Sequence, residues 1–142
     1  MEIFPLFGNQ LKGSPHVFDF SSKNTNIENY DTEDFNNFQS TIFTELEESG
    51  KNWGIGKYLE ERSSLLRNYK QIVDEKRVFH VGLDIITEKD TSLYCPLEGT
   101  IEMIGKEEGK GNYGGYIILK HEIENCIFYS FYGHLNTNYT VE

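Results

Sequence analysis

Basic residues, cysteines and long apolar runs are scarce in this sequence. Its 142 residues include 13 Lys and Arg against 23 Asp and Glu, and the formal net charge is −10. Because binding to phosphates requires basic patches, this balance argues against nucleic acid as the main partner and against an anionic membrane surface. No apolar run reaches the roughly 18 residues that a membrane-spanning helix needs, so no transmembrane segment is predicted.

Two cysteines, Cys95 and Cys126, are too few for a disulfide framework. Both lie in apolar, strand-like surroundings, so we expect buried free thiols, with a single bridge as the alternative. Residues 1–10 do not read as a signal peptide, because they have no basic region and Pro5 and Gly8 interrupt their apolar residues.

Helical periodicity is confined to the first half of the chain. It predicts a helix over about residues 32–48, capped by Asp31 or Thr32. A break at 53–56 separates this helix from a second helical stretch over about 57–70. The apolar stripe of the first helix consists of Phe35, Phe38, Ile42 and Leu46.

Strand periodicity replaces helical periodicity after residue 78. Several short strands with close turns indicate a mainly antiparallel sheet. We therefore predict an α+β fold, with an irregular and helical N-terminal segment (1–76) and a β domain (77–142). The expected strands cover about residues 79–86, 92–95, 100–105, 115–121 and 126–133.

The first of these strands carries a histidine and a carboxylate. Alternate residues of a strand share a face, so His80, Gly82 and Asp84 are expected to point the same way. Imidazole and carboxylate are both zinc ligands, and glycine leaves space between them. Taken alone, the pair favours the plainer alternative of a half-buried strand with a polar face, because a two-residue match is weak.

Two more histidines, His121 and His134, end the last two predicted strands. We expect the turn between these strands to let both imidazoles reach one cleft. His16 lies in the irregular N-terminal segment and is expected to be a surface histidine. The residues expected to share the face of His134 are Phe128, Ser130 and Tyr132.

Four ordered blocks of the sequence resemble the M23 metallopeptidases, the enzymes of the lysostaphin and LytM type. The family pattern is H-x-G-x-D, then V-x-A-P-x-D-G-x-V, then Y-G with a downstream histidine, then Y-x-H-L. The resemblance covers about residues 77–138, and GKYLEER at 56–62 also resembles an element of an M23 subgroup. The matching blocks are HVGLD (80–84), YCPLEGTI (94–101), NYGG (112–115) with His121, and YGHL (132–135).

The resemblance implies a β-sheet of the M23, duplicated hybrid motif, type, with Zn²⁺ in its groove. It also implies hydrolysis of peptide bonds such as those of peptidoglycan. By motif position His80 and Asp84 would be zinc ligands, His134 a catalytic histidine, and His121 a catalytic or supporting one.

The family takes a third zinc ligand and a second catalytic histidine from a downstream H-x-H motif, which this sequence does not contain. We therefore expect a C-terminally incomplete member that binds zinc weakly and is inactive or nearly so as a peptidase. We also expect an exposed sheet edge, which promotes association.

Several alternatives stay open at this point. One is a catalytically inactive M23-like module that binds cell-wall peptides or a protein partner. Another is a carrier domain of the sugar-phosphotransferase type, although Asp84 and the Y-x-H-L block favour the peptidase. A third is completion of the site by His16 or by a partner chain. The compartment is also open, because the missing signal peptide indicates the cytoplasm whereas a cell-wall substrate requires export.

Overall fold

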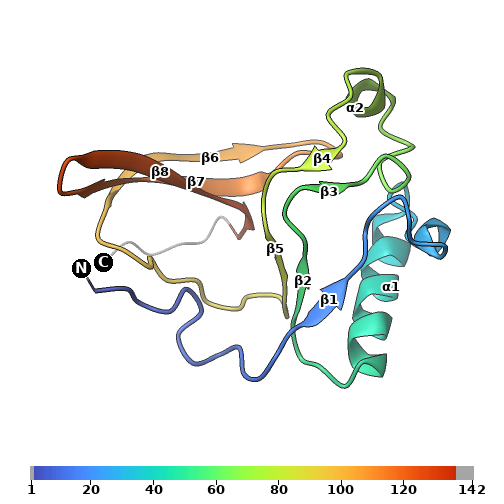
Figure 1. Cartoon of the computed structure of the whole chain (residues 1–142), viewed down its shortest axis with the longest axis horizontal. Helices are drawn as coiled ribbons and strands as arrows, with labels where there is room; N and C mark the ends of the chain where they lie inside the picture. Colours follow the sequence, from blue (N-terminus) through green and yellow to red (C-terminus); the bar gives the residue numbers. More distant parts are fainter. Residues whose placement is uncertain (1, 137–142) are drawn as a thin grey trace. The chain divides into compact units, whose positions relative to one another are not determined.

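The computed structural model describes residues 2–136 of the chain (Figure 1). It divides into two compact units: Leu11–Lys89, here called the helical unit, and the sheet unit, formed by residues 2–10 and 90–136. Helices and mainly antiparallel strands give the α+β class that the sequence predicts. The predicted boundary at 76/77 lies inside the helical unit, which therefore contains the whole H-x-G-x-D block.

A three-stranded sheet of order β1-β2-β5 organises the helical unit. Strand β1 (His16–Phe18) pairs in parallel with β2 (Gly54–Gly56), which pairs antiparallel with β5 (Asp84–Ile86). The break in the helical pattern predicted at 53–56 thus contains the central strand of this sheet. A glycine is required at Gly54, since a Cβ there would lie 2.4 Å from Cε2 of Phe18.

Helix α1 (Phe35–Glu48) confirms the helix predicted over 32–48. Its N-cap is Asp34, whose carboxylate accepts hydrogen bonds from the backbone N–H groups of Asn36 and Asn37. The predicted caps are therefore wrong, and the helix begins later than expected.

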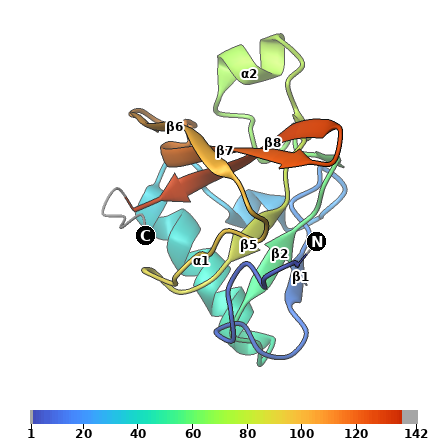
Figure 2. The same ribbon diagram turned by 90° about the vertical axis from the view of Figure 1, so that its left-hand side faces the viewer.

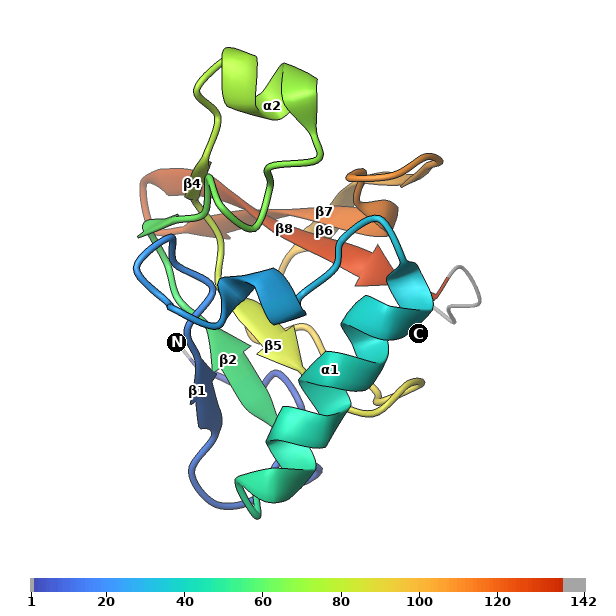
Figure 3. The same ribbon diagram turned by 90° about the vertical axis from the view of Figure 1, so that its right-hand side faces the viewer.

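The core of the helical unit forms where α1 lies along the β1-β2-β5 sheet (Figure 3). The stacked rings of Phe18 and Phe20, with centroids 5.3 Å apart, lie at its centre. Phe35 belongs to the predicted stripe but is 71% exposed, because it is the first residue of the helix. The buried cluster consists of Phe18, Phe20, Ile27 from the 3-10 helix Ile27–Asn29, Tyr30, Ile42, Leu46 and Leu65.

The second predicted helix, over 57–70, is wrong. These residues form turns and strand β3 (Glu60–Glu61), which pairs antiparallel with β4 (Phe79–His80). Pairing with a distant strand prevails here over local helical preference, which is a weak determinant of structure. A short helix, α2 (Lys70–Asp74), follows. No helix among residues 2–136 is long and apolar enough to span a membrane.

The sheet unit is built on the antiparallel sheet β6-β7-β8 (Figure 2). This sheet confirms the strands predicted over 100–105, 115–121 and 126–133. The strand predicted over 92–95 is not formed, although Tyr94 N donates to the carbonyl of Leu6. The strands are β6 (Thr100–Glu107), β7 (Gly114–Ile123) and β8 (Cys126–Leu135).

Both cysteines lie in the sheet unit as free thiols. The prediction that Cys95 and Cys126 are unpaired is confirmed, whereas the prediction that they are buried is wrong. Cys126 is the first residue of β8, where the β7–β8 hairpin turns, so its side chain lies outside any core.

Candidate metal site

The H-x-G-x-D block does not form one continuous strand. Strand β4 ends at His80 and strand β5 begins at Asp84, and the two strands belong to different sheets. The three residues between them pass from one sheet to the other, with Val81 74% and Leu83 58% exposed. The strand predicted over 79–86 is therefore interrupted at its middle.

His80 and Asp84 nevertheless converge. Atom Nε2 of His80 lies 3.3 Å from Oδ1 of Asp84, and the two side chains are 25% and 31% exposed. A Cβ at Gly82 would lie 3.2 Å from the same Nε2 atom, so the glycine keeps this side open. The side chains of His80 and Asp84 therefore meet although no continuous strand joins them.

The other ring nitrogen of His80 is held by the backbone. Nδ1 lies 3.2 Å from the carbonyl oxygen of Lys57. Because a carbonyl only accepts hydrogen bonds, this contact places a proton on Nδ1 and leaves Nε2 as the ring atom that faces Asp84. Histidines that bind metals are oriented in this manner, with the second nitrogen donating to a carbonyl or carboxylate.

The second oxygen of the Asp84 carboxylate faces a buried arginine. Nη2 of Arg62 lies 2.8 Å from Oδ2, and Nε of the same arginine lies 3.0 Å from Oε2 of Glu60. The strand β2 passes beside this ion pair at Gly56, where a Cβ would lie 2.5 Å from Oδ2. The carboxylate is therefore engaged on one oxygen and open toward His80 on the other.

The ion pairs continue away from the site. The Lys57 ammonium lies 3.5 Å from Oε1 of Glu60 and 3.6 Å from Oδ1 of Asp19. Hydrogen bonding with Ser21 lowers the pKa of Asp19, and the Lys57 ammonium adds to this effect. Lys57 thus contacts His80 through its backbone carbonyl and the carboxylates of Glu60 and Asp19 through its side chain.

His121 lies in the sheet unit and is fully buried. Nδ1 lies 3.0 Å from the carbonyl oxygen of Glu98, and Nε2 lies 2.7 Å from Oγ of Ser130. Its ring also stacks on Phe128 at 4.9 Å between centroids. Both ring nitrogens are therefore used in bonds within the sheet unit.

His134 lies at a β-bulge near the end of β8. The register between β7 and β8 shifts between Gly115 and Ile117, and Leu135 takes the place opposite Gly115. His134 itself has φ 58°, and its backbone N–H donates to the Tyr113 carbonyl. The strand alternation from which we predicted its face therefore stops before His134, whose side chain is exposed.

The two histidines of the sheet unit do not converge. His121 pairs with Phe128, whereas His134 lies six residues further along β8, which corresponds to roughly 20 Å at the usual strand rise. The prediction that the β7–β8 turn brings both to one cleft is wrong, because the register places them at opposite ends of the hairpin.

His16 does not behave as a free surface histidine. Its Nε2 lies 2.7 Å from Oε1 of Glu45, with the two side chains 23% and 35% exposed. The Tyr30 hydroxyl donates to the other oxygen of Glu45. His16 thus joins β1 to α1 in the helical unit.

The patterns that indicate zinc ligands in the sequence include neither Arg62 nor Gly56. Both lie in the GKYLEER element, so a signal existed in the resemblance of that element to an M23 subgroup. Its residue types alone did not indicate that the arginine pairs with Asp84.

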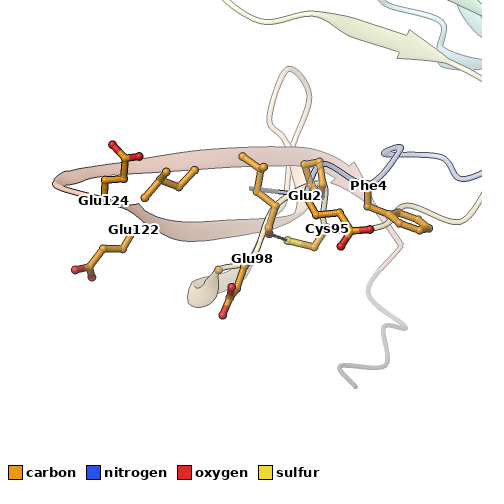
Figure 4. A pocket seen from close by; sticks show the side chains of 10 residues that line it. Glu2, Phe4, Cys95, Glu98, Glu122 and Glu124 are labelled. Atoms are coloured by element: carbon orange, nitrogen blue, oxygen red, sulfur yellow. Dashed lines mark hydrogen bonds between the residues drawn. The ribbon is translucent and has the colours of Figure 1, made fainter.

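An open hollow of about 860 Å³ lies in the sheet unit, and none of the predicted site residues lines it (Figure 4). The carboxylates of Glu98, Glu122 and Glu124 point in different directions around it, so they form no common ligand set. Among residues 2–136 no three His, Cys, Asp or Glu side chains are arranged to hold a metal.

Comparison of the chain with protein-family models, with curated proteins and with solved structures finds no match.

Proposed function

We propose that the chain is a zinc metallopeptidase of the M23 type that hydrolyses peptide bonds in peptidoglycan or similar peptides, with His80 and Asp84 as two zinc ligands. The carrying observation is the 3.3 Å between His80 Nε2 and Asp84 Oδ1. Two ligand atoms bound to one tetrahedral zinc lie roughly 3.3–3.6 Å apart, from the usual Zn–N and Zn–O lengths. A direct His–Asp ion pair is the competing explanation, and metal titration distinguishes the two.

The groups around the pair support this proposal. The Lys57 carbonyl accepts a hydrogen bond from Nδ1 of His80, which directs Nε2 toward Asp84. Gly82 leaves the space beside that nitrogen unfilled. The side chains are partly exposed, so a metal and a substrate have access to them.

Zinc in such a site supplies Lewis acidity, which acidifies a water molecule and polarises the scissile carbonyl. The chain's own residues would position that chemistry. The exposed His134 is the proposed catalytic histidine, moving a proton or stabilising negative charge on the substrate. We propose a supporting role for His121, because both of its ring nitrogens are already bonded.

A zinc peptidase needs a third protein ligand. We propose that a segment carrying an H-x-H motif, or a partner chain, supplies this third ligand. We also propose that the sheet is of the M23 type. The antiparallel β6-β7-β8 sheet is compatible with that type.

Titration of the purified chain with Zn²⁺ and Co²⁺ tests the two ligands. We expect His80→Ala and Asp84→Asn to abolish binding of stoichiometric metal. The control His16→Ala removes a half-buried histidine of the same unit and should leave metal affinity unchanged. Equal binding by all four proteins would contradict the site.

Hydrolysis of a glycine-rich peptide tests the reaction. We expect little turnover by the 142 residues and clear turnover after fusion of an H-x-H segment, lost again with His80→Ala. Metal and peptide binding without turnover in the fusion would instead favour the inactive M23-like binding module.

A further inference from the structure

We infer that Arg62 is a positioning residue that makes Asp84 a monodentate metal ligand through Oδ1. This inference rests on the proposed zinc site. Arg62 itself lies outside the motifs that carry the proposed ligands. Segment 56–62 would thus orient the side chains of both proposed ligands.

The contact between Arg62 and Asp84 determines which carboxylate oxygen is available. Nη2 lies 2.8 Å from Oδ2 as an ion pair, while Oδ1 faces His80 at 3.3 Å. A metal ion approaching Oδ2 would meet the guanidinium charge at short range, where repulsion between cations is strong. Oδ1 is therefore the oxygen that remains for a metal.

Arg62 is itself held on several sides. It is 8% exposed, and its Nε lies 3.0 Å from Oε2 of Glu60, which is 6% exposed. Its guanidinium carbon lies 5.0 Å from the centroid of the Phe20 ring, and its backbone N–H donates to the Val78 carbonyl. These contacts hold the guanidinium with Nη2 directed at Asp84.

The guanidinium bridges two carboxylates in a way that lysine cannot reproduce. Nε pairs with Glu60 and Nη2 pairs with Asp84, so the planar guanidinium contacts both carboxylates at once. Among residues 2–136 the buried Nη2 has no aligned hydrogen bond, so its role toward Asp84 is electrostatic. A lysine ammonium at this position would form an ion pair with one of the two carboxylates and leave the other without this partner.

The backbone is adapted to this ion pair at Gly56. A Cβ there would lie 2.5 Å from Oδ2 of Asp84 and 2.9 Å from Nη2 of Arg62. Gly56 starts the segment whose Lys57 carbonyl orients His80. One segment therefore orients both proposed ligands.

The experiment measures Co²⁺ affinity and the visible spectrum of bound cobalt for the whole chain and its Arg62→Lys and Gly56→Ala variants. Folding of each metal-free protein is measured by circular dichroism and urea unfolding. Arg77→Lys is the control for the arginine change, because Arg77 pairs with Glu75 at an exposed site in the same unit.

We expect Arg62→Lys and Gly56→Ala to weaken cobalt binding about 10- to 100-fold, as loss of outer-shell partners of metal ligands does. Their cobalt spectra should also change, because the guanidinium no longer holds the Asp84 carboxylate in its native orientation. Arg77→Lys should keep the wild-type affinity and spectrum. If Arg62→Lys does not fold, Gly56→Ala decides the question through the same two readouts.

Wild-type affinity and spectrum in whichever of these two variants folds would overturn the role of Arg62 and leave the proposed function standing. Cobalt binding that survives His80→Ala unchanged, or no binding by the wild type, would overturn the zinc site and this inference with it. The two failures are thus distinguished by the His80→Ala result.

Discussion

The imidazole of His121 and the hydroxyl of Ser130 lie 2.7 Å apart within the sheet unit. Because Nδ1–H of His121 donates to the Glu98 carbonyl, Nε2 of the neutral ring accepts the hydrogen bond from the Ser130 hydroxyl. The pair lies across two neighbouring strands, β7 and β8, and fixes the buried ring in one orientation.

Removal of this hydroxyl is expected to destabilise the sheet unit. Ser130→Ala leaves a buried ring nitrogen without a partner, which typically costs about 1–3 kcal/mol in the free energy of unfolding. Urea unfolding followed by circular dichroism measures the change. Ser92→Ala removes an exposed serine side chain of the same unit and should change stability by less than about 0.5 kcal/mol. Equal effects of the two substitutions would contradict the role of this hydrogen bond.

The sequence predicts those elements that carry their own periodicity. The stripe with Ile42 and Leu46 predicts α1, and alternation predicts β6, β7 and β8. Strand β2 could not be predicted, because three residues with two glycines have no local strand signal. Its partners β1 and β5 come from distant parts of the chain.

The same distinction applies to the site. His80 and Asp84 lie within one short block, so their convergence could be predicted from local geometry. The pairing of Arg62 with Asp84 depends on how β3, β4 and β5 are arranged in space. The position of His134 depends on a bulge, which follows from the β7–β8 register and not from alternation along one strand.

Substitution of the observed helix cap tests the start of α1. Asp34→Ala removes the acceptor for the N–H groups of Asn36 and Asn37, which should lower the free energy of unfolding by about 1 kcal/mol. Asp34→Asn should restore most of it. Asp31→Ala, at one of the caps expected from the sequence, should have a smaller effect in the same urea titration. A larger effect at Asp31 would show that the helix starts earlier in solution.

The buried ion pair between Glu60 and Arg62 should be costly to break. Glu60→Ala leaves the guanidinium with one carboxylate and removes the acceptor for the Phe20 N–H group. We expect a loss of about 3–5 kcal/mol, as for other buried pairs that lose one partner. Glu75→Ala breaks an exposed pair with Arg77 and should cost less than about 1 kcal/mol in the same unfolding assay. Similar losses for both would mean that Glu60 is solvated in solution.

Alkaline pH should destabilise the helical unit through Tyr30. Burial, ahead of the hydrogen bond to Glu45 and the charge of that carboxylate, raises the pKa of Tyr30 above its ordinary value of 10.0. The neutral hydroxyl is therefore favoured in the folded state. Its contribution is fully present below the unfolded pKa, near pH 10, and is lost as the pH rises toward the folded pKa.

Urea unfolding at a series of pH values from about 9 to 11 measures this loss. Tyr30→Phe should flatten the decline in stability, whereas Tyr58→Phe, at a tyrosine that is 61% exposed, should leave it unchanged. An identical decline in Tyr30→Phe and wild type would contradict the assignment.

Substitution of His134 should affect peptide hydrolysis and the free energy of unfolding in different ways. Its φ of 58° lies in the left-handed region, where an L-residue is strained by about 1 kcal/mol or more relative to glycine. Strain held at a non-glycine residue in a bulge is a mark of functional sites. His134→Gly should therefore leave stability unchanged or raise it by up to about 1 kcal/mol, and should abolish peptide hydrolysis by the H-x-H fusion. Glu124→Gly relieves a similar φ of 54° in the β7–β8 turn and should have the same effect on stability with full hydrolysis. Full hydrolysis by His134→Gly would show that this histidine takes no part in the reaction.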